Sequence, residues 1–410
     1  MKSNLSSIEG FPEKNRRDFL KGSICLVAGA SLIRGENRAA DNPGRTSAKL
    51  KAAVIGHTGK GDYGHGHELI FNDYPNIEVV AVADPVAAGR AKAAERCRAA
   101  RQYASYREML DKEKPQLVSV ALRTTDQHHA MIKAALQAGA HVYSEKPFTQ
   151  TLAEADDLLA TADKAGLRIV VAHQMPYAPN VQKLKKALAA GLIGELLEIR
   201  AHGKQDNRAG GEDMIVLGTH LFDLICRFAG DPLWCTARVQ QKGRDITRND
   251  AHPATENIGP IAGDEIHANF ACPAGVNVTF TSRAKNRQTA GLWGLELIGS
   301  KGAVKILTEA IPKIYLLKSG DWTAQGRTNE WYPWPEDPTL NWSTAEKSFG
   351  PSNRRLVDDW LDAIRTNRDP VSSGRSATKA LEMVLAVYEA ALTGRRVAMP
   401  MTKRTHPLEA

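Results

Sequence analysis

Cysteine is scarce in this chain, with five residues among 410. No two of them are separated by only two residues, so neither a zinc site nor a disulfide framework has the spacing it requires, and no metal site is expected. Cys25 lies near the N-terminus, and Cys97, Cys226, Cys235 and Cys272 are scattered through the rest. A single bridge between Cys226 and Cys235 is one alternative in an oxidising compartment. Buried free thiols are the other, and we favour them.

Clusters of like charge are also missing. The chain carries 54 Lys and Arg against 46 Asp and Glu, a net charge of +8, and +3 of this falls within residues 1–40. Along the rest, basic residues are interleaved with acidic ones and form no basic patch. Nucleic-acid binding requires such a patch, so neither DNA nor RNA is expected as a partner.

The N-terminus lacks a hydrophobic run long enough to span a bilayer. The apolar stretch 24–33 is too short for that, and it follows the pair Arg16-Arg17 with Phe19-Leu20 just beyond. This arrangement predicts a twin-arginine export signal and linker over residues 1–40, a periplasmic or other extracytoplasmic location, and no stable insertion into the membrane. Because this route exports folded proteins, the leader also favours a tightly bound cofactor.

The length of 410 residues exceeds that of a usual single domain. Strands and helices alternate up to residue 172, strand-like runs dominate from residue 195, and helices return near the C-terminus. Alternation predicts a parallel sheet, whereas a succession of strands predicts an antiparallel or mixed one. We expect a Rossmann domain over 48–172, a sheet domain over 173–350, and C-terminal helices over 351–400 that pack back on the Rossmann domain.

The first domain opens with a β-α-β unit. The pattern predicts a strand over 50–55, a glycine-rich turn over 56–64, a helix over 65–72 and a strand over 77–83 that ends at Asp84. In Rossmann folds such glycines let a pyrophosphate approach the backbone at a helix N-terminus, and an acid after the second strand binds the adenosine ribose. An acid there repels a 2′-phosphate, which favours NAD over NADP. The expected cofactor ligands in this unit are Gly56, Thr58, Gly59, Gly61 and Asp84.

Polar residues also follow a later strand, predicted over 117–122. Thr124 and Thr125 would face the cofactor as strand-end hydroxyls, and His129 stands at the start of a helix that reaches residue 138. Open α/β sheets bind ligands at the carboxyl ends of their strands, so we expect all three residues to contact the cofactor. The alternative for His129 is a solvated position at a helix start.

The strand predicted over 142–144 ends at Glu145-Lys146-Pro147, where we expect the chemistry. Glu145 and Lys146 would contact the cofactor. A lysine beside a cationic nicotinamide has its charged form disfavoured and exchanges protons near neutral pH. The alternative is a solvated lysine at a strand end.

The second domain contains strand-like runs and one clear helix, over 219–228. On that helix His220 and Asp223 are three residues apart and share a face. A carboxylate beside an imidazole fixes its tautomer and raises its pKa, as a general acid/base requires. The alternative is that His220 and Asp223 only satisfy each other's hydrogen-bonding groups and have no role in catalysis. The predicted strands are 197–203, 236–242, 266–270, 276–282, 295–298, 304–307 and 314–317.

Together these parts resemble the Gfo/Idh/MocA superfamily of glucose-fructose oxidoreductase, inositol dehydrogenase and relatives. The motifs are the Gly56 turn, Asp84, residues 124–129, Glu145-Lys146-Pro147, residues 191–195 and residues 217–223. The resemblance implies an α/β chain with an N-terminal Rossmann dinucleotide-binding domain and a C-terminal α+β domain with a large open, mostly antiparallel sheet. It implies that this sheet binds substrate and joins subunits into a homo-oligomer, that Lys146 meets nicotinamide ribose and substrate, and that His220 is the acid/base.

Two departures from the family pattern concern the substrate side. Val216 stands where members commonly have Asp or Asn, four residues before the histidine, so Asp206, Arg208 or Asp213 would have to assist instead. After the strand predicted over 168–172, Met175-Pro176 replaces the basic residue that is frequent in the family. Gln174, Tyr177, Asp206 and Arg208 are therefore the expected substrate contacts.

The sequence predicts an exported, NAD-dependent oxidoreductase that transfers hydride at a ring hydroxyl carbon of a carbohydrate. One alternative is a glycoside hydrolase that retains its NAD and oxidises the sugar only transiently. The export signal and Val216 favour this alternative. A second alternative is a non-catalytic sugar-binding protein on a Rossmann frame.

Overall fold

The computed structural model describes residues 49–284, 293–308, 312–318, 330–335 and 349–409. The predicted export signal over residues 1–40 lies outside these ranges. Among the helices described, none combines the length and the apolar character needed to cross a membrane.

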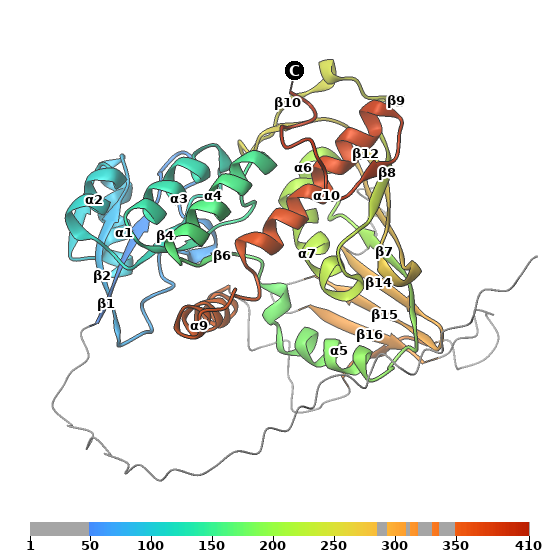
Figure 1. Cartoon of the computed structure of the whole chain (residues 1–410), viewed down its shortest axis with the longest axis horizontal. Coiled ribbons are helices and arrows are strands. Elements are labelled where there is room, and N and C mark those ends of the chain that lie inside the picture. Colours follow the sequence, from blue (N-terminus) through green and yellow to red (C-terminus); the bar gives the residue numbers. More distant parts are fainter. Residues whose placement is uncertain (1–48, 285–292, 309–311, 319–329, 336–348, 410) are drawn as a thin grey trace, which may run out of the picture. The chain divides into compact units, whose positions relative to one another are not determined.

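The N-terminal domain is a six-stranded sheet with the order β3-β2-β1-β4-β5-β6. All its neighbouring strands run parallel. Residues 52–55 of β1 are at most 1% exposed, because helices cover both faces of the sheet (Figure 1). This confirms the Rossmann prediction. The strands are β1 (Leu50–Ile55), β2 (Ile77–Ala83), β3 (Arg101–Tyr103), β4 (Leu117–Val120), β5 (His141–Ser144) and β6 (Ile169–Val171), and the helices are α1 (Ala87–Cys97), α2 (Tyr106–Glu113), α3 (His128–Gln137) and α4 (Leu152–Ala165).

The helix predicted over 65–72 is wrong. Only one short 3₁₀ turn, η2 (Gly64–Gly66), is present there, and irregular turns follow it. His65 and Gly66 have φ angles of 48° and 76°, in the left-handed region that a right-handed helix cannot contain. The glycine-rich turn therefore has no helix N-terminus directly behind it.

The second domain is built on a ten-stranded sheet, counted over the described residues, with the order β17-β16-β15-β14-β7-β13-β12-β8-β18 and β9 beside β8. Its pairs are antiparallel except β7 with β13, which confirms the prediction of a mostly antiparallel sheet. The strands are β7 (Leu196–His202), β8 (Trp234–Gln241), β9 (Arg244–Asp245), β12 (Glu265–Ala271), β13 (Asn277–Arg283), β14 (Gly294–Gly299), β15 (Gly302–Leu307), β16 (Lys313–Leu317), β17 (Tyr332–Pro333) and β18 (Val397–Ala398).

Helices cover one face of this sheet, and burial alternates along its strands. In β12, Ile266, Ala268 and Phe270 are buried and join the same core as helix α7 (Gly218–Ala229). The sequence predicted this helix but missed α6 (Gly211–Val216), which directly precedes it. The remaining elements here are α5 (Pro179–Ala189) and the short pair β10 (His252–Pro253) and β11 (Pro260–Ile261).

The two C-terminal helices pack differently. Leu356, Val357 and Trp360 of α9 (Gly350–Thr366) enter the core on one face of the Rossmann sheet. Helix α10 (Gly374–Thr393) begins in a Rossmann core at Ala377 but buries most of its length in the core of the second domain, where it lies across α7 and β8 (Figure 1). It was expected to pack back on the first domain, and it contacts the second domain as well.

The four described cysteines, Cys97, Cys226, Cys235 and Cys272, are unbridged. Three of them are buried, and Cys226 is partly buried with its Sγ 3.8 Å from Sδ of Met383. The alternative of a bridge between Cys226 and Cys235 is therefore not realised, and the thiols act as small apolar side chains.

Candidate active site

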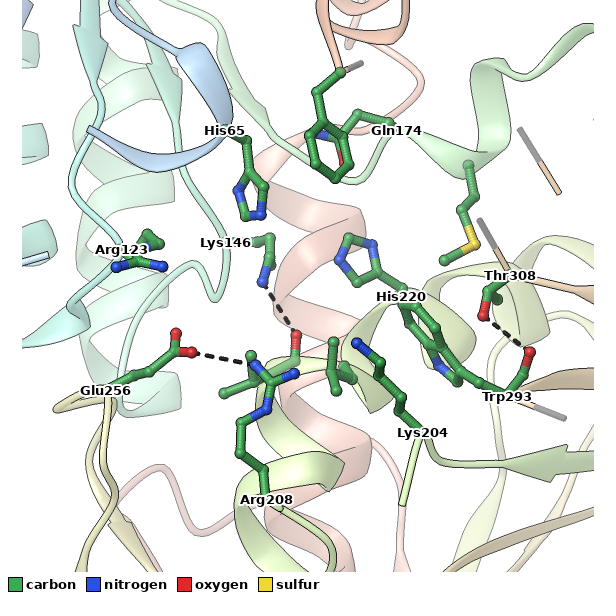
Figure 2. A pocket seen from close by; sticks show the side chains of 14 residues that line it. His65, Arg123, Lys146, Gln174, Lys204, Arg208, His220, Glu256, Trp293 and Thr308 are labelled. Atoms are coloured by element: carbon green, nitrogen blue, oxygen red, sulfur yellow. Dashed lines mark hydrogen bonds and ion pairs between the residues drawn. The ribbon is translucent and has the colours of Figure 1, made fainter. Parts of the chain in front are cut away.

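A pocket of about 490 Å³ lies between residues that follow Rossmann strands and residues of the second domain (Figure 2). Arg123 follows β4, Lys146 follows β5 and Gln174 follows β6, whereas Lys204 follows β7 and His220 lies on α7. The full lining is His65, Arg123, Lys146, Gln174, Met175, Lys204, Arg208, Val216, Leu217, His220, Glu256, Trp293, Thr308 and Phe349.

Lys146 is held inside this pocket and not in solvent. The residue is 7% exposed, and its Nζ donates a hydrogen bond to the carbonyl oxygen of Val216 at 3.2 Å. Burial lowers the pKa of Lys146, because removing the ammonium from water penalises the charged form. The alternative of a solvated lysine is thus wrong, and the neighbouring domain supplies the backbone partner of the amine.

His220 lies in the first turn of α7 and points into the same cavity (Figure 2). It is 9% exposed, and its Nδ1 has no hydrogen-bond partner among the described residues. Burial lowers the pKa of His220 well below its usual value, and Lys146 and His173 add to this. An uncharged imidazole of this kind can accept a proton.

His173 is a further imidazole at the site that the sequence did not single out. Its ring centroid lies 5.3 Å from that of His220 in an edge-to-face arrangement, and neither of its nitrogens has a partner among the described residues. Burial lowers the pKa of His173 to about 4. The two rings therefore stand together as neutral groups at neutral pH.

The predicted pairing of His220 with Asp223 is not what the structure shows. Both carboxylate oxygens of Asp223 accept hydrogen bonds from Arg227, one turn further along α7, at 2.9 Å each. The Asp223 side chain is 2% exposed and that of Arg227 16%. Asp223 is thus satisfied by a buried arginine and does not fix the tautomer of His220.

Asp84 organises the glycine-rich turn. Its Oδ2 accepts from the Thr58 backbone N–H at 2.9 Å, from the Thr58 hydroxyl at 2.7 Å and from the Tyr63 hydroxyl at 3.0 Å, and its Oδ1 accepts from Val86 N–H at 2.8 Å. A ribose hydroxyl would have to share or replace one of these donors. The ribose contact of Asp84 stays a prediction, and the ordering of Thr58 by Asp84 is what the structure adds.

Gly61 packs against the end of β4. Its φ of +86° favours glycine, and a Cβ there would stand 2.7 Å from the backbone nitrogens of Arg123 and Thr124. Gly56 directly follows β1, whereas Gly59 has open space around it. These contacts place the turn beside the strand end where the cofactor is expected.

The remaining predicted cofactor residues divide into two groups. Thr124 and Thr125 are buried at the end of β4, and the Thr124 hydroxyl donates to the Lys60 carbonyl at 3.3 Å. His129 instead forms an ion pair with Asp157 of α4 at 2.6 Å. A partner on the helix behind the strand holds this imidazole, so His129 is a helix-to-helix contact and not one of the pocket residues.

Glu145 is fully buried beside two imidazoles from the segment after the glycine-rich turn. Its Oε2 lies 2.9 Å from Nδ1 of His65 and 3.0 Å from Nδ1 of His67, and its Oε1 accepts from Lys146 N–H at 3.1 Å. Burial alone would raise the pKa of Glu145, but His67 and His65 hold it well below its usual value. Glu145 is therefore an anion next to the pocket wall.

Of the predicted substrate contacts, Gln174 and Arg208 line the pocket. Tyr177 does not, because its hydroxyl donates to Asp359 of α9 at 2.7 Å and accepts from Ser372 N–H at 2.9 Å. Asp206 binds the Arg208 guanidinium at 2.7 Å and orients it.

Asp213, the third residue considered as an aid to His220, is buried behind the pocket. It accepts from the Lys204 and Gln205 backbone N–H groups at 3.1 and 3.0 Å and from the Ser282 hydroxyl at 2.6 Å. It shapes the loop that carries Lys204, and it does not line the cavity.

Sequence reasoning missed several lining residues. Arg123 directly follows the strand predicted over 117–122 and carried the same strand-end signal as Thr124, so it could have been found. Lys204, in the loop after β7, was not singled out either, and its Nζ stands 5.8 Å from the Trp293 ring centroid. Trp293 comes from a loop with no pattern that could have placed it.

Asn353 of α9 connects several of these parts. Its Oδ1 accepts from Gln174 at 3.1 Å and from the Tyr143 hydroxyl at 3.4 Å, and its Nδ2 donates to the backbone carbonyl of His65 at 3.0 Å. It is 3% exposed. Helix α9 thus fixes both the turn segment and a pocket side chain.

Comparison with known proteins gives relatives that match different shares of the chain. D-apiose dehydrogenase of Paraburkholderia graminis is 26% identical over 382 residues, which is 88% of this chain and 93% of that protein. A glycosyl hydrolase family 109 protein of Shewanella amazonensis is 28% identical over 202 residues, 45% of this chain and 44% of that protein. A levoglucosan dehydrogenase structure with NADH and levoglucosan has a TM-score of 0.70 at 18% identity, covering 86% of this chain and all of that one, which shows the shared fold.

Two family models cover nearly the whole described chain. The model of an oxidoreductase family with an NAD-binding Rossmann fold matches residues 50–173. The model of the C-terminal alpha/beta domain of that family matches residues 185–399. The chain belongs to the Gfo/Idh/MocA family of NAD-dependent oxidoreductases.

Proposed function

We propose that this protein is an exported oxidoreductase that binds NAD tightly and oxidises a hydroxyl-bearing ring carbon of a carbohydrate. The observation that carries the proposal is that Lys146, from a Rossmann strand end, and His220, from the second domain, line one pocket. An acid/base for the hydroxyl proton must stand next to the carbon that gives up hydride, and strand ends of a Rossmann sheet are where a nicotinamide lies.

The residues present fit a dinucleotide, with one departure from the usual pattern. The glycine-rich turn lies at the end of β1, next to β4, where the strand order reverses, and Asp84 at the end of β2 orders the turn through Thr58. Because no helix N-terminus follows the turn, backbone N–H groups and Arg123 would hold the phosphates. When bound, NAD supplies the hydride acceptor.

The chain's own groups then manage the proton and the orientation of the substrate. The uncharged imidazole of His220 or the amine of Lys146 takes the hydroxyl proton, and the Val216 carbonyl keeps that amine directed into the cavity. Gln174, Lys204 and Arg208 offer donors to sugar hydroxyls, and Trp293 offers an apolar face at the same wall. The walls bury Lys146 and His220, which strengthens their interactions with a bound sugar.

A carbohydrate substrate is supported by the activities for which similar proteins are named, among them an apiose dehydrogenase and a levoglucosan dehydrogenase. Export is supported by the paired arginines and short apolar run at the N-terminus. A homo-oligomer joined through the second sheet is supported by the family resemblance, and Leu197 on β7 is 47% exposed there.

A second candidate is a redox-neutral glycoside hydrolase that keeps its NAD. Val216 in place of the usual acid and the similarity to a glycosyl hydrolase family 109 protein over part of the chain favour it. In this cycle oxidation of one hydroxyl carbon would acidify the neighbouring C–H, and loss of that proton would expel the aglycone. Water would then add to the unsaturated ketone and the hydride would return to its carbonyl carbon, so no external oxidant is consumed.

The deciding experiment uses the purified full chain with sugars and glycosides, with and without added NAD. Oxidation that raises reduced-nicotinamide absorbance in step with added NAD supports the oxidoreductase, and aglycone release without added NAD supports the hydrolase. Lys146→Met and His220→Leu should each lower turnover roughly 10²–10⁴-fold. His252→Gln is the matched control, because His252 is exposed and is not one of the residues that line the pocket. Unchanged turnover in both pocket variants, with folding intact, would refute the site.

A further inference from the structure

Two histidines and a glutamate from segments far apart in sequence converge beside the pocket. His65 and His67 lie in the irregular segment after the glycine-rich turn, and Glu145 follows β5. One nitrogen of each imidazole and one carboxylate oxygen all lie within 4.8 Å of one another. The Nδ1 atoms of His65 and His67 stand 2.9 and 3.0 Å from the same oxygen, Oε2 of Glu145.

Hydrogen bonding accounts for His65 but not for His67. The contact from His65 to Glu145 has the geometry of a hydrogen bond. His67 is fully buried, yet neither of its nitrogens makes a hydrogen bond among the described residues, although its Nδ1 is close to Glu145. A buried imidazole with no directed partner is costly, since polar groups removed from water are nearly always satisfied.

A shared metal ion explains this spacing. Ligand atoms of one ion point at a common centre and not at each other, and at metal–ligand distances of about 2.1 Å adjacent ligands of an octahedron stand about 3.0 Å apart. The two contacts to Glu145 Oε2 have this separation without requiring that His67 donate to it. Divalent transition metals bind two imidazoles and one carboxylate on one side, which leaves further coordination positions of the ion open.

The backbone holds His65 for such a role. Its φ of 48° lies in the left-handed region, which is unfavourable for a non-glycine residue and persists where the surroundings enforce it. Asn353 fixes the His65 carbonyl, and the imidazole reaches the pocket lined by Lys146 and His220 (Figure 2). An ion beside His65 would therefore stand at the pocket wall.

We propose that His65 Nδ1, His67 Nδ1 and Glu145 Oε2 bind one divalent transition-metal ion whose open positions serve water or a substrate oxygen. The proposed ligands do not include His220 or Lys146, so binding of the ion can be measured separately from the proposed sugar oxidation.

The test measures metal binding by the full chain without any substrate. Protein stripped with a chelator is titrated with Co²⁺, followed by visible absorption of the protein-bound ion and by equilibrium dialysis with elemental analysis. We expect one Co²⁺ per chain, and an affinity lower by roughly tenfold or more in His65→Gln and in Glu145→Gln. The control His252→Gln replaces an exposed histidine and should bind as the wild type does.

Folding of each variant is checked by circular dichroism. If Glu145→Gln does not fold, His65→Gln decides, because its side chain is 27% exposed and its loss leaves the core intact. Equal Co²⁺ affinity in wild type and His65→Gln, or no stoichiometric binding in the wild type, would overturn the proposal. NAD binding is measured separately in the presence of the chelator. A failure of the metal-site proposal can therefore be distinguished from a failure of the proposed NAD-dependent function.

Discussion

Replacing Asp223 by asparagine should reduce stability and leave catalysis almost unchanged. The side chain is 2% exposed and its two oxygens each accept a 2.9 Å hydrogen bond from Arg227, whose side chain is 16% exposed and which also donates to the Val371 carbonyl at 2.8 Å. Asparagine retains one acceptor but removes the charge, so a mostly buried guanidinium remains without its counter-ion. Breaking such a pair costs about 3–5 kcal/mol, and the retained acceptor should bring the loss to about 2–3 kcal/mol.

The assay is urea unfolding of both proteins, with the free energy obtained from midpoint and slope, alongside turnover per folded molecule. Turnover should stay within about threefold, because Asp223 does not contact His220. Asp223→Leu combined with Arg227→Met should recover most of the lost stability, since replacing a whole buried ion pair by apolar residues is often neutral. If Asp223→Asn unfolds like the wild type and turns over a hundredfold more slowly, the carboxylate acts through His220 and our assignment is wrong.

Two further predictions concern the turn and the response to acid. Gly61→Ala should weaken NAD binding by roughly tenfold or more, because its Cβ would collide with the backbone nitrogens of Arg123 and Thr124, 2.7 Å away. Gly59→Ala is the control: it has a similar φ of +79° but open space around it, so it should lose only roughly 1 kcal/mol of stability. Fluorescence titration with NAD and thermal unfolding distinguish the two variants, and equal NAD affinities would contradict the packing argument. His406 is 1% exposed and burial lowers its pKa to about 4, below the unfolded value, so its stabilising contribution is present above about pH 6.5 and is lost as the pH falls toward 4. His406→Gln should therefore flatten the fall in unfolding free energy between pH 6.5 and 4 by roughly 2–3 kcal/mol, and a parallel pH profile would show that His406 is not the source.

Much of the fold was predictable because it follows from local patterns. Near-continuous apolar runs identified the parallel strands, and alternation identified the strands of the second sheet. The helix over 65–72 failed because its residues permit a helix locally, whereas the packing of His67 and the left-handed φ of His65 and Gly66 override that preference. Helix α6 was missed because its six residues are too few for a period to be recognised.

The candidate site was predicted best where residues follow strands. Lys146 was found for this reason, and His220 was found from its helix and from the family motif. The spacing of three residues suggested that Asp223 interacts with His220. Asp223 is also four residues from Arg227 on the same helix, and in the structure it forms an ion pair with Arg227. The grouping of His65, His67 and Glu145 was not predictable from spacing, since the two segments lie about eighty residues apart.

Asn353 has a consequence for how the protein matures. It stands on α9 and forms hydrogen bonds with Gln174, Tyr143 and the backbone carbonyl of His65. A nascent chain that has emerged only as far as residue 349 therefore has its strand ends and turn but not the clamp that orders them. The pocket should therefore become ordered only after α9 has been synthesised and has packed onto the Rossmann sheet.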